Sequence, residues 1–534
     1  MKTDADVLIV GAGPTGLMLA VELQRRGVDC LLIDAHDKPL TWDRATVVHP
    51  RSIEIFDSLG LADRLLKAGV RQRTARIHSD GKALGEVDLS LSGSRYPFNL
   101  GVSEEVTEAI LTDYLVRLGG TITRSTRLIG LEEREDGVLT TLIGEGEEEQ
   151  AFVRWVVGCD GHHSTVRSLA GIGQDGHDIE EPWAVFDTVI EGWPYSHEAN
   201  FAYFDEPPII LTALPDERWR VYLRPSSEQS DLVADATGTL RLYVPDANFT
   251  AVANPTRFRC HTKVAKKYRS GRLMLAGDAA HTCSPIQGHG MNSGLQDAFN
   301  LAWKLALVAK GVSSDALLDS YEAERRPVAQ KFTAAGDEAD HAQMLKSPDD
   351  RRARDAFIRE VFANPATRHQ EAVAEAELDI DYGASPIVLG DRHAALAPGQ
   401  LWPSDIEIHP SESVPVAFNA GANHLGHVAV VIGGDMAEPD ELSGLHGILE
   451  AYADTPILEA SFLLATQTPV RGSARIDQTV AKRLGVSGVA LFVVRPDGYL
   501  GLRADQHHGE ALAAYSERLG FAALSAPRCP SGPV

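Results

Sequence analysis

The sequence predicts an α/β fold that contains a Rossmann-like dinucleotide-binding domain. Three short apolar runs of strand character, at 6–10, 152–158 and 272–276, each lead into a turn that contains glycine. Apolar residues at helical spacing follow the first and the third of these turns. Strands that alternate with helices in this way are typical of α/β proteins.

The first transition carries the pattern of a dinucleotide-binding loop. Its strand runs directly into a Gly-x-Gly-x-x-Gly segment, Gly11-Ala12-Gly13-Pro14-Thr15-Gly16. Gly11 permits the tight turn, Gly13 lets the backbone approach a pyrophosphate, and Gly16 allows close packing of helix on strand. The first helical turn, which holds Pro14 and Thr15, offers its N–H groups to the anion.

An acidic residue follows where a dinucleotide fold requires one. A second apolar strand at 30–33 ends at Asp34, 18 residues after Gly16. Its carboxylate can accept hydrogen bonds from a ribose hydroxyl. The alternative is a βα turn that only packs, and this segment alone does not distinguish FAD from NAD.

The second transition ends in Cys159-Asp160-Gly161, with Ser164 and Arg167 shortly after it. This spacing places a carboxylate and a guanidinium beside one turn, so Asp160 is a candidate cofactor ligand. The alternative is an Asp-Gly turn followed by an N-capped helix.

The third transition points more specifically to a flavin. Asp278 stands at a strand end, where it can accept hydrogen bonds from ribityl hydroxyls. A segment of small and polar residues then precedes a long helical pattern, and it contains Pro285, Gly288, Gly290, Met291 and Asn292. N–H groups at a helix start stabilise negative charge, which a reduced flavin carries near N1 and its C2 carbonyl.

The composition excludes several classes of protein. With 44% hydrophobic and 23% charged residues the chain is globular, and 50 basic against 75 acidic residues give a net charge of −25, which disfavours nucleic acid and anionic membranes as partners. The apolar runs are too short to span a bilayer, and the N-terminus leaves no room for a signal peptide, so we expect a cytoplasmic protein. The five cysteines form no Cys-x-x-Cys pair, and no metal site is expected.

Together the three motifs resemble the FAD-dependent aromatic hydroxylases, the single-component (class A) flavoprotein monooxygenases. Their order and approximate spacing match that family over about residues 5–340, and the match takes in Arg44-Ala45 and the helical segment 321–327. The nearest likeness is to phenol hydroxylases of the pentachlorophenol 4-monooxygenase type, through 154–158 and 268–271.

The resemblance implies a two-stage reaction. NADPH or NADH reduces the FAD, O2 adds to form the flavin C4a-hydroperoxide, and this species hydroxylates a small phenolic substrate. Members of this family lack a separate nicotinamide-binding Rossmann domain, which agrees with the single Gly-x-Gly-x-x-Gly segment that we find.

The resemblance also assigns contacts to the flavin. Arg44 would lie on a flexible loop that touches it, and the Pro285 carbonyl would flank its reactive edge. The family has a Gln four residues before the Glu that matches Glu108, but this chain has Glu104 there. An additional carboxylate would oppose flavin reduction unless it points away or is protonated.

By the same resemblance the FAD-binding domain is of the GR2 type and discontinuous. It would span 1–175 and be completed by 260–340, with a β-sheet substrate domain at 176–259, a helical bridge at 341–380 and a thioredoxin-like C-terminal domain at 381–534. This tail has no cysteine before Cys529. That absence argues against thiol redox chemistry and favours a structural role that supports a homodimer.

Four residues are candidates for contact with the substrate. Tyr203 and Arg220 lie on the predicted pocket sheet and could hold a phenolate, and alternation would turn Arg220 and Tyr222 to the same face. The alternatives are sheet packing for Tyr203 and a surface charge for Arg220. His289, between two glycines, and Pro285 are the other two candidates.

Two further functions remain open on the sequence. One is a related flavoenzyme that carries out Baeyer–Villiger oxygenation or oxidation on a polyketide-like aromatic compound. The other is a flavin-binding protein without turnover.

Overall fold

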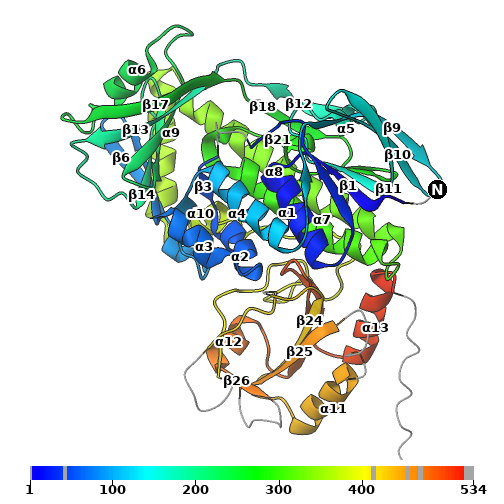
Figure 1. Cartoon of the computed structure of the whole chain (residues 1–534). Coiled ribbons are helices and arrows are strands. Elements are labelled where there is room, and N and C mark those ends of the chain that lie inside the picture. Colours follow the sequence, from blue (N-terminus) through cyan, green and yellow to red (C-terminus); the bar gives the residue numbers. More distant parts are fainter. Residues whose placement is uncertain are drawn as a thin grey trace, which may run out of the picture. The chain divides into compact units, whose positions relative to one another are not determined.

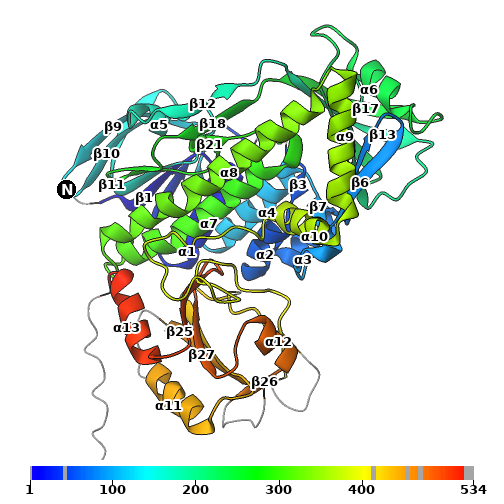
Figure 2. The same ribbon diagram turned by 180° about the vertical axis from the view of Figure 1, so that it is seen from behind.

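The chain divides into two compact units in the computed structural model (Figures 1 and 2). The first comprises 1–24, 29–298 and 326–378, and the second comprises 25–28, 299–325 and 379–534. The structure describes residues 3–39, 45–409, 416–421, 423–450, 452, 458–466 and 473–521. Within these residues no helix has the length and hydropathy that a bilayer crossing needs.

The first unit is built on a sheet whose centre is parallel. Its strand order is β19-β20-β11-β1-β2-β8, with β10 beside β11 and β9 beside β10. The parallel strands are β1 (Ala5–Val10), β2 (Cys30–Ile33), β8 (Ile122–Thr123), β11 (Glu147–Gly158) and β20 (Leu273–Leu275). The antiparallel strands are β9 (Thr126–Arg134), β10 (Gly137–Gly144) and β19 (Arg269–Ser270).

The central strand β1 is apolar throughout because both of its faces are covered. Val7, Leu8 and Ile9 are fully buried, as expected for a strand inside a parallel sheet. Helix α1 (Pro14–Arg25) begins at a proline, whose fixed φ suits the first helical position. Helix α7 (His289–Ala309) also lies beside this sheet (Figure 1).

A second, seven-stranded sheet forms the other large part of the first unit, in the order β17-β13-β16-β15-β14-β5-β6. Its strands are β5 (Thr74–Ser79), β6 (Lys82–Asp88), β13 (Trp183–Glu191), β14 (Ala199–Tyr203), β15 (Ile209–Leu214), β16 (Arg218–Leu223) and β17 (Asn248–Phe258). The expected substrate domain at 176–259 omits β5 and β6, which join the sheet through parallel pairing of β5 with β14. Helix α9 (Pro348–Ala363) packs on β6, where Gly85 leaves room for the ring of Phe362.

Shorter elements complete this unit. Two three-stranded sheets consist of β3 (Val47–Val48), β7 (Asn99–Gly101) and β4 (Val70–Gln72), and of β12 (Gln174–Asp178), β18 (His261–Ala265) and β21 (His281–Thr282). The other helices are α2 (Pro50–Ser58), α3 (Ala62–Ala68), α4 (Glu104–Arg117), α5 (Thr165–Leu169), α6 (Leu232–Leu240), α8 (Asp319–Gln343) and α10 (Pro365–Glu375). Short 3₁₀ turns lie at Leu89–Leu91, Gly277–Ala279, Pro285–Gln287 and Asp315–Leu318.

The second unit contains a mixed sheet in the order β23-β22-β26-β25-β24-β27-β28. Its strands are β22 (Glu407–His409), β23 (Val416–Ala417), β24 (His427–Gly433), β25 (Leu458–Ala465), β26 (Ala474–Ile476), β27 (Val489–Val494) and β28 (Leu500–Ala504). Its helices are α11 (Pro439–Glu450), α12 (Gln478–Arg483) and α13 (His508–Arg518). Residues 299–325, expected within the FAD-binding domain, cluster with this unit instead.

The strands expected from apolar runs in the sequence are confirmed. The runs at 6–10, 30–33, 152–158 and 272–276 coincide with β1, β2, the end of β11 and β20. The mixed α/β fold with a parallel sheet is therefore confirmed at this level.

Candidate functional site

The turns that follow the parallel strands of the first sheet gather at one edge. Because carboxyl ends of parallel strands meet at one edge, the glycine loop after β1, Asp34 after β2, Asp160 after β11 and Asp278 after β20 lie close together. Backbone hydrogen bonds join them: the Cys159 N–H donates to the Val10 carbonyl at 2.8 Å. Ligands of open α/β sheets bind at this position.

Each glycine of the loop meets a different constraint. Gly11 has a φ of +103°, and a Cβ there would lie 2.4 Å from the Cys159 carbonyl oxygen. A Cβ on Gly16 would lie 1.9 Å from the Gly11 carbonyl oxygen. At Gly13 the nearest atom would be Glu108 Oε1, 3.8 Å away. Protein packing therefore explains Gly11 and Gly16, whereas the open space at Gly13 fits a bound pyrophosphate.

Asp34 braces the glycine loop from the next strand. Its Oδ2 accepts a hydrogen bond from the Ala12 N–H at 2.7 Å, and its Oδ1 accepts one from the His36 N–H at 2.8 Å. A carboxylate has further lone pairs beyond these two bonds, so the geometry also allows a ribose hydroxyl as donor.

Asp160 accepts hydrogen bonds from the start of α5. Its Oδ2 accepts from the N–H groups of Thr165 and Val166 at 2.7 and 3.2 Å. Ser164 is the N-cap of this helix, as the alternative of an N-capped helix predicts. Burial raises the pKa of the Asp160 carboxyl, although its hydrogen bonds oppose the rise. Nearby, Arg167 donates to the carbonyls of His162 and Ala279, and it thereby ties this turn to the turn that carries Asp278.

The turn at Asp278 is held in place by a buried carboxylate of α7. The carboxylate of Asp297, fully buried on α7, accepts from the Gly277 N–H at 3.0 Å and from His281 Nε2 at 2.9 Å. His281 is thus a hydrogen-bonded structural residue. Asp278 itself is exposed at this edge, where a ribityl chain could reach it. Thr15 fills the space beside Gly277, where a Cβ would lie 2.5 Å from Thr15 Oγ1.

Glu104 points toward the backbone of Ala45. Its Oε2 accepts a hydrogen bond from the Ala45 N–H at 3.3 Å, and it lies in the first turn of α4, where the helix dipole favours a negative charge. Arg44 lies outside the described residues.

The entrance of α7 is built from two glycines and a buried amide. Gly288 adopts a φ of +72° at the end of the turn that begins at Pro285, and a Cβ on Gly290 would meet nothing within 4 Å. The Asn292 Oδ1 accepts from the His49 N–H, and its Nδ2 donates to the carbonyls of Val47 and Gly288. The Asn292 side chain therefore fastens this entrance to β3, so any cofactor contact here falls to the backbone. Met291, half-buried, lies in the same turn.

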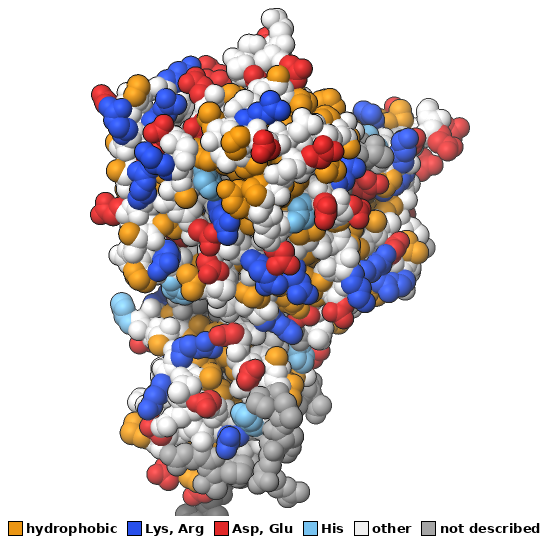
Figure 3. Space-filling view, turned by 90° about the vertical axis from the view of Figure 1, so that its left-hand side faces the viewer, with side chains coloured by type: hydrophobic (Ala, Val, Ile, Leu, Met, Phe, Trp, Pro, Cys, Tyr) orange, Lys and Arg blue, Asp and Glu red, His pale blue; other side chains and the backbone are white. Residues whose placement is uncertain are grey.

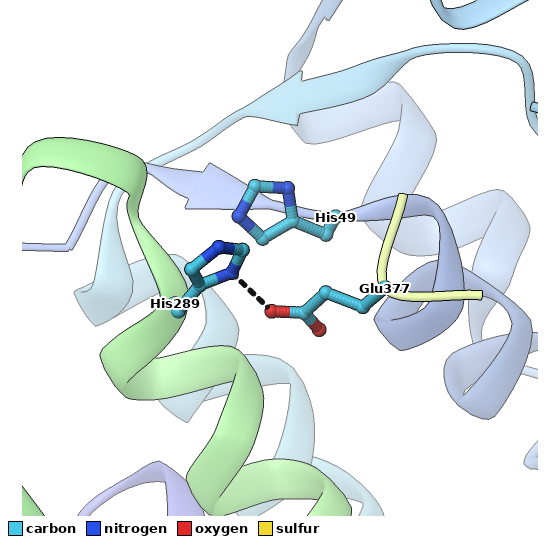
Figure 4. A group of neighbouring side chains, drawn as sticks. All are labelled: His49, His289 and Glu377. Atoms are coloured by element: carbon cyan, nitrogen blue, oxygen red, sulfur yellow. Dashed lines mark hydrogen bonds and ion pairs between the residues drawn. The ribbon is translucent and has the colours of Figure 1, made fainter. Parts of the chain in front are cut away.

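His289 belongs to a buried cluster with His49 and Glu377 (Figure 4). Its Nδ1 donates to Glu377 Oε1 at 2.7 Å, and its ring stacks on Phe332 with centroids 4.3 Å apart. The three ligand atoms lie within 4.8 Å of one another, which is compatible with a metal ion. However, both nitrogens of His49 and the Nδ1 of His289 already form hydrogen bonds, which account for the cluster without an ion.

Arg220 is a buried ion-paired residue, not the surface charge of the alternative hypothesis. Its guanidinium forms two parallel bonds to the Asp187 carboxylate, at 2.7 and 2.9 Å. Tyr222 lies on the same face, and its hydroxyl is 3.1 Å from Thr46 Oγ1. Ile286 of the Pro285 turn packs against the cluster that contains Tyr222. This face of the sheet therefore looks toward the entrance of α7.

Tyr203 lies on the opposite face, which corrects the expectation that it and Arg220 could hold one oxygen. The register pairs Tyr203 with Ile209 and Ile209 with Leu223, whereas Arg220 is an odd number of positions away on the same strand. Tyr203 is 1% exposed in the core beneath α6, where burial raises its pKa.

The sequence missed several residues of this site. Asp187, Glu377 and His49 carry no local motif, and each meets its partner only through sheet pairing or across distant segments. On the face drawn in Figure 3, basic side chains are interspersed with acidic ones rather than gathered in one area.

Comparisons with known proteins agree with this geometry. A family model described as "FAD binding domain" matches residues 4–335. The chain is 31% identical to the 6-methylpretetramide 4-monooxygenase of Streptomyces rimosus, over 97% of this chain and 95% of that protein. It is 35% identical to the pentachlorophenol 4-monooxygenase of Sphingobium chlorophenolicum, over 62% of this chain and 63% of that protein. Among solved structures it resembles an anhydrotetracycline hydroxylase from Streptomyces rimosus, with 27% identity, a TM-score of 0.74 and coverage of 97% and 99%.

Proposed function

Since the chain belongs to the FAD-binding family of flavin-dependent aromatic monooxygenases, we propose that it hydroxylates a phenolic ring of a multi-ring, polyketide-like compound, with NADH or NADPH as electron donor. One relative that is similar over nearly the whole chain is named for 6-methylpretetramide, a multi-ring compound, whereas the likeness to the pentachlorophenol enzyme covers less than two thirds of either chain. The full-length similarity favours the larger substrate.

One observation carries the proposal. The open space at Gly13, Asp34 and the exposed Asp278 meet at one sheet edge, next to the entrance of α7. We propose that Gly11, Gly13, Pro14, Thr15 and Gly16 hold the pyrophosphate, Asp34 the ribose and Asp278 the ribityl chain. The backbone at Gly288, Gly290, Met291 and Asn292 would face the flavin ring, with Arg44 and, at the start of α4, Glu104 as further contacts and Asp160 bracing the edge.

The bound flavin supplies electron transfer and oxygen activation. The chain's own residues would hold the phenol on the face of β16 that carries Arg220 and Tyr222, opposite the Pro285 turn. The Tyr222 hydroxyl, 3.1 Å from Thr46 Oγ1, would orient the phenol. His289, whose Nδ1–H donates to Glu377 Oε1, is proposed to take the phenolic proton, because a phenolate is more electron-rich than a phenol. Apolar walls at Ile286 and Val185 would exclude water.

Labelled oxygen tests this function. The purified enzyme, loaded with FAD, is given NADPH or NADH, a set of polycyclic and simple phenols, and ¹⁸O₂. We expect one ¹⁸O atom in a new ring hydroxyl, and faster turnover with polycyclic phenols. A label in a lactone would instead support Baeyer–Villiger oxygenation, and NAD(P)H oxidation that responds to no phenol would support a flavin-binding protein without turnover.

For the second unit we propose a thioredoxin-like scaffold that supports a homodimer. Parallel β24 and β25 beside the β27–β28 hairpin, in the order β25-β24-β27-β28, support this topology. Light scattering of the full chain tests the homodimer: a mass near twice 57.7 kDa supports it, and a monomer contradicts it.

A further inference from the structure

His49 is a fully buried histidine whose ring lies beside the turn that leads into α7. It precedes α2, and its side chain is 0% exposed. The Nε2 lies 3.1 Å from the Gln287 carbonyl oxygen, and the Nδ1 lies 3.1 Å from the Asn99 Oδ1. Both ring nitrogens therefore face oxygen atoms.

Both of these oxygens can only accept hydrogen bonds. The Gln287 oxygen is a backbone carbonyl, and the orientation of the Asn99 amide is fixed by its Nδ2, which donates to Glu375 Oε1 at 2.8 Å. If the amide were turned around, its oxygen would face the carboxylate and two acceptors would oppose each other. Each nitrogen of His49 therefore faces an acceptor, and both can donate at once only when the ring is an imidazolium.

A buried cation requires a counter-charge, and the structure provides one. Glu375 Oε1 lies 3.8 Å from His49 Nδ1, and the Glu375 side chain is 20% exposed. The other ionisable groups around the His49 ring are His289 and Glu377 (Figure 4). The ring centroids of His49 and His289 lie 5.1 Å apart, and Glu377 accepts a hydrogen bond from His289. Arg51 and Glu54 of α2 pair with each other. The start of α2 disfavours a cation, which makes the carboxylate of Glu375 necessary.

We propose that His49 is the fixed cation of the active site, held by Asn99 and Gln287 and balanced by Glu375. This inference rests on the proposed flavin site at the entrance of α7. There the imidazolium adds to the positive end of the helix and favours anionic species, the reduced flavin and the phenolate. Glu375 is then a positioning residue that tunes this charge through Asn99.

The protonation state is tested directly on the full-length wild-type protein. ¹⁵N spectra of histidine-labelled enzyme are recorded at pH 7.5, and the His49 signals are assigned by their loss in His49→Gln. We expect both His49 nitrogens to be protonated, with or without FAD. A His49 ring with one unprotonated nitrogen overturns the proposal, whatever the flavin does, because this measurement does not depend on the proposed flavin site.

The effect on the flavin is tested by the midpoint potential of the FAD-loaded enzyme. His49→Gln should shift it to more negative values, and Glu375→Gln should shift it to more positive values. The ratio of the affinities for reduced and oxidised FAD should change by about three- to tenfold in each case. His369→Gln, an exposed histidine on the same helix as Glu375, is the control and should leave the potential unchanged.

The opposite signs separate an electrostatic role from a structural one. Shifts of both variants in the same direction, or no shift in the partly exposed Glu375→Gln, contradict the proposal. If wild-type protein bound no FAD, the proposed function would fail, while the ¹⁵N result would still stand.

Discussion

Among the glycines of the loop, Gly13 is required by a ligand, whereas Gly11 and Gly16 are required by packing. A Cβ at this position meets nothing closer than 3.8 Å, and its backbone is not in the left-handed region. We predict that Gly13→Val folds like wild type but loses FAD, because the side chain would occupy the space of the pyrophosphate. Flavin absorbance after purification and far-ultraviolet circular dichroism measure both properties. Full retention of FAD would contradict the assignment of this loop.

Gly16→Ala is the matched comparison, since its Cβ would lie 1.9 Å from the Gly11 carbonyl oxygen. This smaller substitution should lower the stability of the protein itself, by about 1–3 kcal/mol for an overpacked site. Thermal unfolding of flavin-free protein measures it. An unchanged melting temperature would show that the loop can move aside.

Two variants separate the structural role of the Arg220–Asp187 ion pair from a catalytic role of Arg220. Arg220→Met leaves the buried Asp187 carboxylate unpaired, which should cost about 3–5 kcal/mol. Arg220→Met combined with Asp187→Asn removes both charges and should recover most of that stability. If Arg220 also assists the substrate, the double variant stays slow in hydroxylation and releases more hydrogen peroxide. If the stable double variant hydroxylates the substrate as fast as wild type and releases no more hydrogen peroxide, Arg220 is purely structural.

Sequence patterns predicted the residues whose neighbours are local. The glycine loop, Asp34 and Asp278 follow strands directly, so their shared edge was foreseeable from the parallel order. The partner of Arg220 lies 33 positions away, and that of His289 lies 88 positions away. The face of Tyr203 depends on the register across two hairpins, and alternation within a single strand does not reveal that register.

At the scale of elements, the second unit contains a buried charge cluster that joins α7, α8 and the turn after β27. Arg495 forms two bonds to the Glu324 carboxylate, at 2.7 and 2.8 Å, and Lys304 donates to the same carboxylate at 2.7 Å. Asp497 pairs with Arg495, and Trp303 Nε1 donates to it at 3.0 Å. Burial disfavours the Glu324 anion, but the charges of Arg495 and Lys304 outweigh this and lower its pKa.

The lowered pKa of Glu324 determines how the stability of the protein depends on pH. A carboxyl with a lowered pKa in the folded state stabilises the protein above its ordinary pKa, about 4.3, and loses this contribution as the pH falls below it. Burial lowers the pKa of Lys304 to about 8, so this group stays charged throughout the acid range. We predict that wild type loses stability more steeply than Glu324→Gln between pH 5 and pH 3, by up to about 1.4 kcal/mol per pH unit.

Urea unfolding at several pH values measures this difference, with hydrogen exchange in β27 as a local probe. Glu324→Gln should also be less stable at neutral pH by about 3–5 kcal/mol, since Arg495 and Lys304 lose a shared partner. Glu338→Gln, an exposed position on the same helix, should behave like wild type. Parallel pH curves for wild type and Glu324→Gln would contradict the assigned role.

The element boundaries show where local patterns are sufficient. Apolar runs located β1, β2 and β20 closely, because buried strands read as continuous hydrophobic segments. The pairing of β5 with β14 was not foreseeable, since it joins segments more than 100 residues apart. For the same reason the sequence did not indicate that 299–325 clusters with the C-terminal sheet.

At the scale of the whole molecule, one dinucleotide loop must serve an enzyme that is proposed to use two dinucleotides. The sequence has one Gly-x-Gly-x-x-Gly segment after a strand, and we assign it to FAD, so NAD(P)H would bind only transiently.

An enzyme of this kind wastes reductant and forms hydrogen peroxide if its flavin is reduced without substrate. We therefore predict that a bound phenol speeds flavin reduction by at least about tenfold, which corresponds to a decrease of about 1.4 kcal/mol in activation free energy. Anaerobic stopped-flow mixing of FAD-loaded enzyme with NADPH or NADH, with and without a phenol that is hydroxylated, measures both rates. A non-substrate aromatic of similar size is the control for occupancy alone. Equal rates with and without a confirmed substrate would contradict this gating.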